Sequence, residues 1–192
     1  MKLLLRRARS HQALDDYEAA KADLDKILIL EPGNGEATGL LKGVQAKLDG
    51  VTFNKYREEA NRLLQQREFQ AALESYDKAL KVTRKATTLD NIAVYVNKTA
   101  CLLSLDKLDR VVSECNEAIR LIRNYRNRYT NVKGADLERL KQMDLRVAVR
   151  RGNALGKLQR VSEAIAEYER ALKIDPDNAA IKKDLDLLRK AK

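Results

Sequence analysis

Apolar and small residues recur every three to four positions along most of the chain, which is the spacing of the buried face of an amphipathic helix. The pattern itself repeats with a period of about 34 residues, the length of a pair of antiparallel helices. Counted from Leu145, the segment 145–178 has small residues at positions 8, 20 and 27 and a proline at position 32: Gly152, Ala164, Ala171 and Pro176. This spacing predicts two helices that cross closely at the small residues, with a proline after the second helix.

The same register fits three further segments, which begin at Met1, Phe53 and Ile92. Their residues at positions 8, 20 and 27 are small or apolar: Ala8, Ala20 and Ile27; Ala60, Ala72 and Ala79; Thr99, Val111 and Ala118. The segment from Ile92 matches least well. Neither helix of such a hairpin can bury its apolar stripe alone, so we expect the hairpins to stack and form a continuous core.

Three segments interrupt the repeats and set the expected domain boundaries. The stretch 33–50 contains five of the eight glycines, which weaken a helix, so we expect a capping or linker helix that ends near Leu48. The insertion 126–144 can lengthen the helices on either side, and 179–191 predicts a terminal helix. The sequence therefore predicts two domains: 1–50, a single hairpin with a capping or linker helix, and 51–192, a three-repeat module with an insertion near 126–144 and a C-terminal capping helix.

This spacing of small residues, with the proline that follows, resembles the tetratricopeptide repeat. The resemblance implies an all-α fold, a right-handed superhelical solenoid of antiparallel helix hairpins with capping helices. It also implies that the first helix of each repeat lines a concave groove in which proteins or peptides bind. We therefore expect a protein-binding adaptor and not an enzyme, and no catalytic set of residues can be assembled from the sequence.

Five polar residues stand at groove-facing positions of the three-repeat module: Arg57, Asn61, Asn97, Arg146 and Arg150. They resemble the carboxylate clamp of chaperone-binding tetratricopeptide domains, which commonly has lysine where Arg57 and Arg146 stand. A guanidinium can hold a carboxylate with two parallel hydrogen bonds, and an asparagine amide can donate another. The resemblance implies that these residues bind the terminal carboxylates of an acidic peptide.

Other residues are secondary candidates for peptide binding. Val96 and Ala100 could contact an apolar residue before the acidic end, and Lys157 could add a charge. In the first repeat, Lys2 and Arg6 occupy the positions of Arg146 and Arg150. We therefore expect a partial clamp there, at the end of a module whose earlier repeats would precede Met1.

The net charge of +10 is concentrated in one region. Residues 120–160 contain twelve lysines and arginines against three acidic residues. Tyr125 and Tyr129 lie among these cations and could stack on bases while Arg126 and Arg128 contact phosphates. No nucleic-acid-binding motif accompanies the charge, so we favour a solvated helix extension over RNA binding.

The sequence argues against membrane-spanning, secreted and metal-binding proteins. No apolar run is long enough to span a membrane, and the start of the chain does not resemble a signal peptide. The two cysteines, Cys101 and Cys115, lie within helical patterns, and His11 is the single histidine. We expect no metal site, no cofactor and reduced thiols packed in the core, as in a cytoplasmic protein.

The sequence thus predicts a co-chaperone that binds the acidic C-terminal tail, Glu-Glu-Val-Asp in the family, of cytosolic heat-shock chaperones. The insertion followed by Val149-Arg150-Arg151-Gly152 is also similar to co-chaperones that assist axonemal dynein assembly. Two alternatives stay open: a ciliary or centrosomal scaffold that binds a helix or peptide of another protein, and RNA binding through the basic region. The client proteins and the oligomeric state are not indicated by the sequence.

Overall fold

The computed structural model describes residues 1–83 and 86–190 of the chain. All regular secondary structure in these residues is α-helical, which confirms the predicted all-α class. The chain divides into two compact units, Met1–Lys55 and Tyr56–Lys192.

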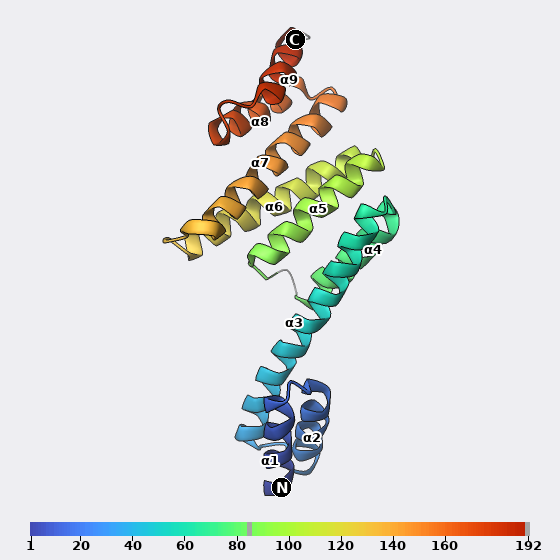
Figure 1. Cartoon of the computed structure of the whole chain (residues 1–192), viewed down its shortest axis with the longest axis vertical. Helices are drawn as coiled ribbons and strands as arrows, with labels where there is room; N and C mark the ends of the chain where they lie inside the picture. The colour runs from blue at the N-terminus through green and yellow to red at the C-terminus, as the bar shows by residue number, and fades with distance from the viewer. Residues whose placement is uncertain (84–85, 191–192) are drawn as a thin grey trace. The chain divides into compact units, whose positions relative to one another are not determined.

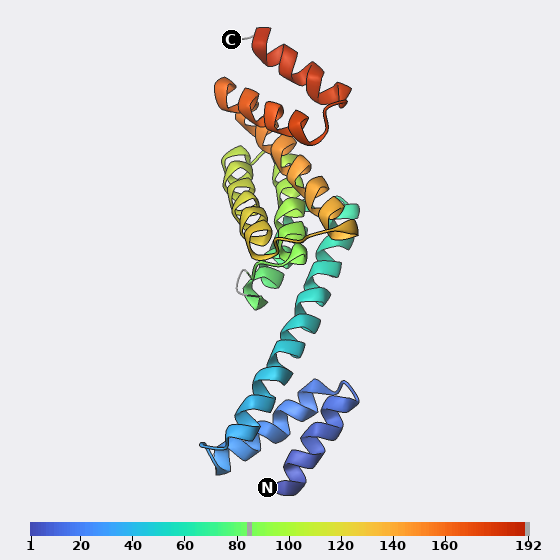
Figure 2. The same cartoon turned by 90° about the vertical axis from the view of Figure 1, so that its left-hand side faces the viewer.

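The first unit consists of α1 (Lys2–Ala13), α2 (Tyr17–Leu30) and the first part of α3 (Gly35–Gln65). The side chain of Asp16 begins α2 by accepting a hydrogen bond of 3.1 Å from the backbone N–H of Ala19. Figures 1 and 2 show the three helices side by side. Their facing apolar residues form the core of this unit: Ala8, Ala20, Leu24, Ile27, Ala37 and Val44.

The second unit contains the last turns of α3, then α4 (Phe69–Val82), α5 (Leu89–Ser104), α6 (Leu108–Arg128), α7 (Gly134–Lys157), α8 (Val161–Ile174) and α9 (Ala179–Lys190). Consecutive helices from α4 to α9 pack against one another, and α5 also contacts α7. Thr88 begins α5 by accepting a hydrogen bond of 3.1 Å from the Asn91 N–H. This packing places α3, α5 and α7, the first helices of their hairpins, on one side of the unit (Figures 1 and 2).

One helix boundary differs from the sequence prediction. The expected end near Leu48 and the expected module start at residue 51 both fall inside α3, which continues from Gly35 to Gln65 without a break. The chain has only two prolines, Pro32 and Pro176, so none interrupts this stretch. Glycine weakens a helix by about 1 kcal/mol relative to alanine but does not block its hydrogen bonds, so α3 passes through Gly50.

A left-handed residue closes the first helix of each hairpin at the same repeat position. Counted from Met1, Phe53, Ile92 and Leu145, the fifteenth residues all have φ between 53° and 62°: Asp15, Arg67, Asp106 and Gln159. The next N–H donates in each case to a carbonyl five residues back, with N–O distances of 2.9 Å. These bonds satisfy carbonyls at the helix end, and they show that the predicted register holds in all four described hairpins.

Small residues at the predicted crossing positions are buried, as expected. Gly152 lies very close to the second helix, because a Cβ built there would be 3.2 Å from Cε2 of the Tyr168 ring. Tyr168, at position 24 of the same repeat, is itself buried. The ring of the second helix therefore takes the space that a side chain at position 8 would need.

A further repeated feature is an ion pair between the two helices of a hairpin. Positions 7 and 23 form a salt bridge in three of the described repeats: Arg7 with Asp23, Lys98 with Glu114, and Arg151 with Glu167. The second repeat has Glu59 and Ser75 at these positions, so it lacks a cation there. Lys98 also contacts Asp77 of that repeat at 2.7 Å.

The insertion 126–144 forms helix on both sides of a short connection. It prolongs α6 to Arg128 and lets α7 begin at Gly134, eleven residues before the repeat register starts at Leu145. The predicted terminal helix corresponds to α9, which is described to Lys190; its expected last residue, Ala191, lies outside the described residues.

Candidate functional site

A groove of about 560 Å³ lies in the second unit, between α3, α5 and α7. We call it the α3/α5/α7 groove, and its lining residues are Arg57, Asn61, Ala93, Val94, Asn97, Ala135, Glu138, Arg139, Gln142, Met143 and Arg146. Four of the five predicted clamp residues are among them. They come from the first helices of three hairpins, as the repeat geometry requires: Arg57 and Asn61 from α3, Asn97 from α5 and Arg146 from α7.

Two asparagines meet on the groove wall. Asn61 Oδ1 accepts a hydrogen bond of 2.6 Å from the Tyr76 hydroxyl and one of 3.1 Å from Asn97 Nδ2. Burial raises the pKa of Tyr76 to about 12, so this hydroxyl remains a donor at neutral pH. Because its oxygen faces the protein, Asn61 presents its Nδ2 as the group that can donate to a ligand.

Arg146 is an exposed cation of the groove. In the described ranges no carboxylate and no hydrogen-bond acceptor is paired with its guanidinium, although Glu138 lines the same groove. A guanidinium without a partner keeps all five of its N–H donors for a ligand.

Arg150 is placed differently from the prediction. Its Nη1 donates to the backbone carbonyl of Val96 and, at 3.2 Å, to Oγ1 of Thr99. Arg150 is not among the groove-lining residues, and burial together with the nearby Arg146 lowers its pKa. The α-helical spacing of four residues puts both arginines on one side of α7, but the long side chain of Arg150 reaches back to α5.

The expectation for Val96 is wrong. Its side chain is 1% exposed and packs in the core, so it offers no apolar surface to a peptide. What it contributes is its backbone carbonyl, which binds Arg150. Ala100 is partly buried on the same helix and does not line the α3/α5/α7 groove.

The remaining secondary candidates lie elsewhere. Lys157, the last residue of α7, forms a salt bridge of 3.1 Å with Asp106 and does not line the groove. Lys2 and Arg6 are exposed on α1 and belong to the first unit. Their role as a partial clamp therefore stays a prediction.

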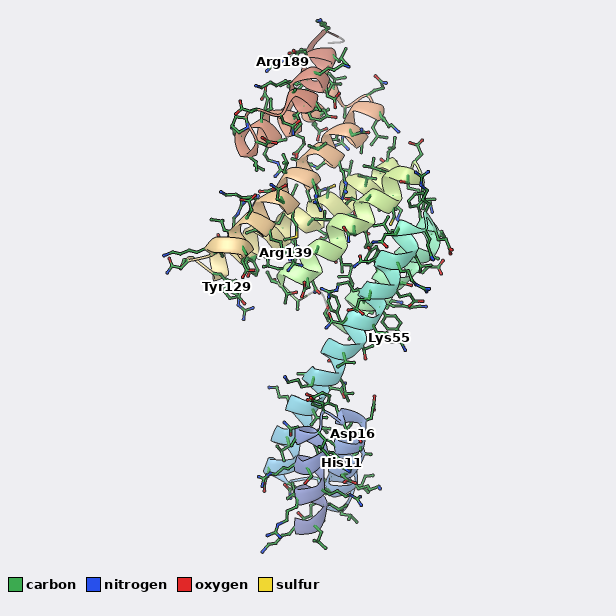
Figure 3. All side chains as sticks on the ribbon, in the orientation of Figure 1. His11, Asp16, Lys55, Tyr129, Arg139 and Arg189 are labelled. Carbon is green, nitrogen blue, oxygen red and sulfur yellow. The ribbon has the colours of Figure 1, made fainter. Side chains whose placement is uncertain are left out.

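Asp90 and Arg139, two charged residues that contact each other beside Arg57 of the groove, were not predicted from the sequence. Asp90, in the first turn of α5, lies 2.9 Å from Nη1 of Arg57 and 2.7 Å from Nη2 of Arg139. Arg139 lies on the early part of α7 and points toward the groove (Figure 3). It precedes Arg146 by seven residues, or two helical turns, and this spacing could have predicted that both arginines lie on one face of α7.

The tyrosines of the basic region pack against each other. The rings of Tyr125 and Tyr129 are 4.6 Å apart, and the guanidinium of Arg128 lies 5.7 Å from the Tyr129 ring centre. Arg126 forms a salt bridge of 3.0 Å with the largely buried Asp144. These contacts tie the aromatic and cationic groups to one another and to the fold.

The cysteines are packed in the core, as expected. Burial raises the pKa of Cys101 to about 11 and that of Cys115 to about 12, so both thiols stay protonated. No group of three or more metal-binding side chains occurs among the described residues. Within that same part of the chain, every helix is too short or too polar to cross a membrane.

Comparison with known proteins supports the repeat assignment. A tetratricopeptide-repeat model matches residues 2–34, and another model of this repeat matches residues 152–181. The DnaJ homolog subfamily C member 7 homolog of Dictyostelium discoideum is 22% identical over 89% of this chain, and dynein axonemal assembly factor 4 of Rattus norvegicus is 28% identical over 69% of it. The chain spans 27% and 28% of the length of these relatives.

A solved structure described as the first tetratricopeptide domain of Spaghetti (RPAP3) bound to the HSP90 peptide SRMEEVD has the same fold. It is 23% identical, with a TM-score of 0.57, and the match covers 73% of this chain and 93% of that chain. The predicted resemblance is confirmed, and the fold is one of protein interaction, typically without enzymatic activity. The chain contains tetratricopeptide repeats at residues 2–34 and 152–181.

Proposed function

We propose that the α3/α5/α7 groove binds the C-terminal carboxylates of an acidic peptide, of the Glu-Glu-Val-Asp type carried by cytosolic heat-shock chaperones. The chain would then act as a co-chaperone adaptor that joins such a chaperone to a client or scaffold protein. The observation that carries the proposal is the convergence of Asn61, Asn97 and the exposed Arg146 in one groove.

The donors suit two carboxylates that lie close together. Asn61 can donate through Nδ2, and Arg146 can hold a carboxylate with two parallel hydrogen bonds. Arg57, on α3, adds a second guanidinium to the groove, where it also pairs with Asp90. Arg150, behind the groove, adds positive potential without direct contact.

Two comparisons support the proposal. The Spaghetti (RPAP3) domain of the same fold is described with a peptide that ends in Glu-Glu-Val-Asp. Dynein axonemal assembly factor 4 is among the similar proteins, so dynein assembly is the process in which we propose to look for clients.

The test is calorimetric titration with the peptide Met-Glu-Glu-Val-Asp and with the same peptide amidated at its C-terminus. We expect a Kd on the order of micromolar for the free acid, which is about 8 kcal/mol, and at least about tenfold weaker binding for the amide. The Arg146→Gln variant should lose a similar factor, because it removes the guanidinium and keeps the helix.

Lys141→Gln is the matched control. Lys141 is an exposed cation on the same helix and lies outside the groove lining. Equal binding of acid and amide by a folded chain, or equal losses in the Arg146 and Lys141 variants, would contradict the proposal. Such results would favour a scaffold that recognises its partner by shape.

A further inference from the structure

Asp90 stands between two arginines of the groove and occupies them in the free protein. One oxygen, Oδ1, lies 2.9 Å from Arg57 Nη1 and 2.7 Å from Arg139 Nη2. We propose that Arg57 and Arg139 form a subsite for an acidic side chain of the bound peptide, and that Asp90 is an internal competitor for this subsite. The inference rests on the proposed function and adds a subsite that would distinguish peptides by an acidic residue upstream of the C-terminus.

The contact with Asp90 uses only part of the Arg139 guanidinium. Arg57 and Arg139 contact the same oxygen of Asp90, and Arg139 does so with one nitrogen. A bidentate pair with a second carboxylate would use more of the guanidinium fork. The Asp90 side chain is 43% exposed and that of Arg139 is 45% exposed, so both can move without opening the core.

The position of Arg139 indicates which peptide residue it would meet. Arg139 and Arg146 are seven residues apart on α7, which corresponds to about 10 Å along the helix at 1.5 Å per residue. An extended peptide advances about 3.3 Å per residue. A peptide that is anchored at Arg146 and runs along α7 therefore reaches Arg139 with the residue three before its C-terminal residue.

In the tail Glu-Glu-Val-Asp, that residue is the first glutamate. Its carboxylate would replace Asp90 on Arg139, and Asp90 would turn to water at the start of α5. A peptide with an uncharged residue at this place has no carboxylate to replace that of Asp90, so Asp90 stays on Arg57 and Arg139. Asp90 thus lowers the affinity for peptides that carry the upstream acid, because their carboxylate must displace it, and leaves peptides without that acid nearly unaffected.

The experiment compares the peptides Met-Glu-Glu-Val-Asp and Met-Ala-Glu-Val-Asp by calorimetric titration of the full chain. We expect the unmodified protein to prefer the first by about threefold to tenfold, the range of a partly exposed ion pair to a good one. Arg139→Gln should bring this ratio below about twofold while leaving the Kd of the alanine peptide nearly unchanged. Asp90→Asn should tighten the glutamate peptide by about threefold or more.

The controls separate the inference from the proposed function. Lys141→Gln should leave the peptide ratio as it is, and circular dichroism confirms that each variant is folded. A ratio that Arg139→Gln does not change, or an Asp90→Asn variant that binds no tighter, overturns the inference while the carboxylate clamp stands. Failure of the unmodified chain to bind either peptide overturns both.

Discussion

At the scale of single residues, Gly152 packs directly against the Tyr168 ring. A Cβ on residue 152 would lie 3.2 Å and 3.3 Å from ring carbons that are themselves buried. The ring cannot move away without disturbing the crossing of α7 and α8, because interiors are closely packed. The glycine is therefore required by its neighbour and not by its backbone angles.

We predict that Gly152→Ala destabilises the second unit by about 1–2 kcal/mol, the cost of overpacking less the gain in helix propensity. Hydrogen exchange of the α7 and α8 amides measures the effect locally. Gly43→Ala is the control of opposite sign: nothing lies within 4 Å of a Cβ there, so alanine should stabilise α3 by about 0.5–1 kcal/mol. A gain in stability at both positions would show that the contact with Tyr168 is not limiting.

The sequence placed residues on the correct helix face but could not give the course of long side chains. The place of Arg57, Asn61, Asn97 and Arg146 in the groove lining was predictable because a backbone position in a repeat determines the face. Arg150 and Val96 were misjudged because a flexible arginine can turn from the groove to a carbonyl on α5. Arg139 was missed because the register says nothing about an insertion that prolongs α7. Asp90 was missed because it precedes Ile92, where the register of the third repeat starts.

At the scale of elements, the hairpins were predictable and the end of one helix was not. A period of 34 residues with small residues at fixed positions specifies two crossing helices, and the left-handed turns confirm its register. The continuity of α3 depends on a balance of weak propensities, in which four glycines reduce helix stability without breaking hydrogen bonds. The ion pairs between positions 7 and 23 were also not predicted, because the pattern of small and apolar residues does not specify which charged side chains meet.

The pair in the first hairpin gives a prediction about pH. Arg7 holds Asp23 with hydrogen bonds of 2.6 Å and 2.5 Å, and these lower the pKa of the Asp23 carboxyl below its usual 3.8. Because the folded-state pKa is lower than the unfolded one, the pair stabilises the hairpin above about pH 4, and this stability is lost as the pH falls through the lowered pKa.

Carbon-detected NMR titration of the Asp23 carboxyl measures this directly. We expect a midpoint below 3.8 in the unmodified chain and a higher midpoint in Arg7→Gln. Arg9→Gln, on the same helix, should leave the midpoint in place, because Arg9 pairs with Glu36 instead. An unshifted midpoint in Arg7→Gln would mean that the ion pair does not form in solution.

At the scale of the whole molecule, the net charge of +10 predicts how binding responds to salt. Groove cations attract an acidic peptide over roughly the Debye length, which is about 8 Å at 0.15 M salt and about 3 Å at 1 M. We therefore expect the Kd of Met-Glu-Glu-Val-Asp to rise by about fivefold or more between 0.05 M and 0.5 M sodium chloride. Calorimetric titration at both concentrations, with sodium sulfate at matched ionic strength as a second salt, tests this; an unchanged Kd would point to apolar contacts and the scaffold alternative.

The ion pairs at positions 7 and 23 have a consequence for how such an array can grow. Both partners lie within one hairpin, sixteen residues apart, so a duplicated gene segment of one repeat carries the cation and the carboxylate together. A pair between different hairpins would lose its partner when the copy acquired new neighbours. A copy of the second repeat, with Glu59 and Ser75 at these positions, would contain no such pair. It would also lose the contact between its Asp77 and Lys98 of the next hairpin.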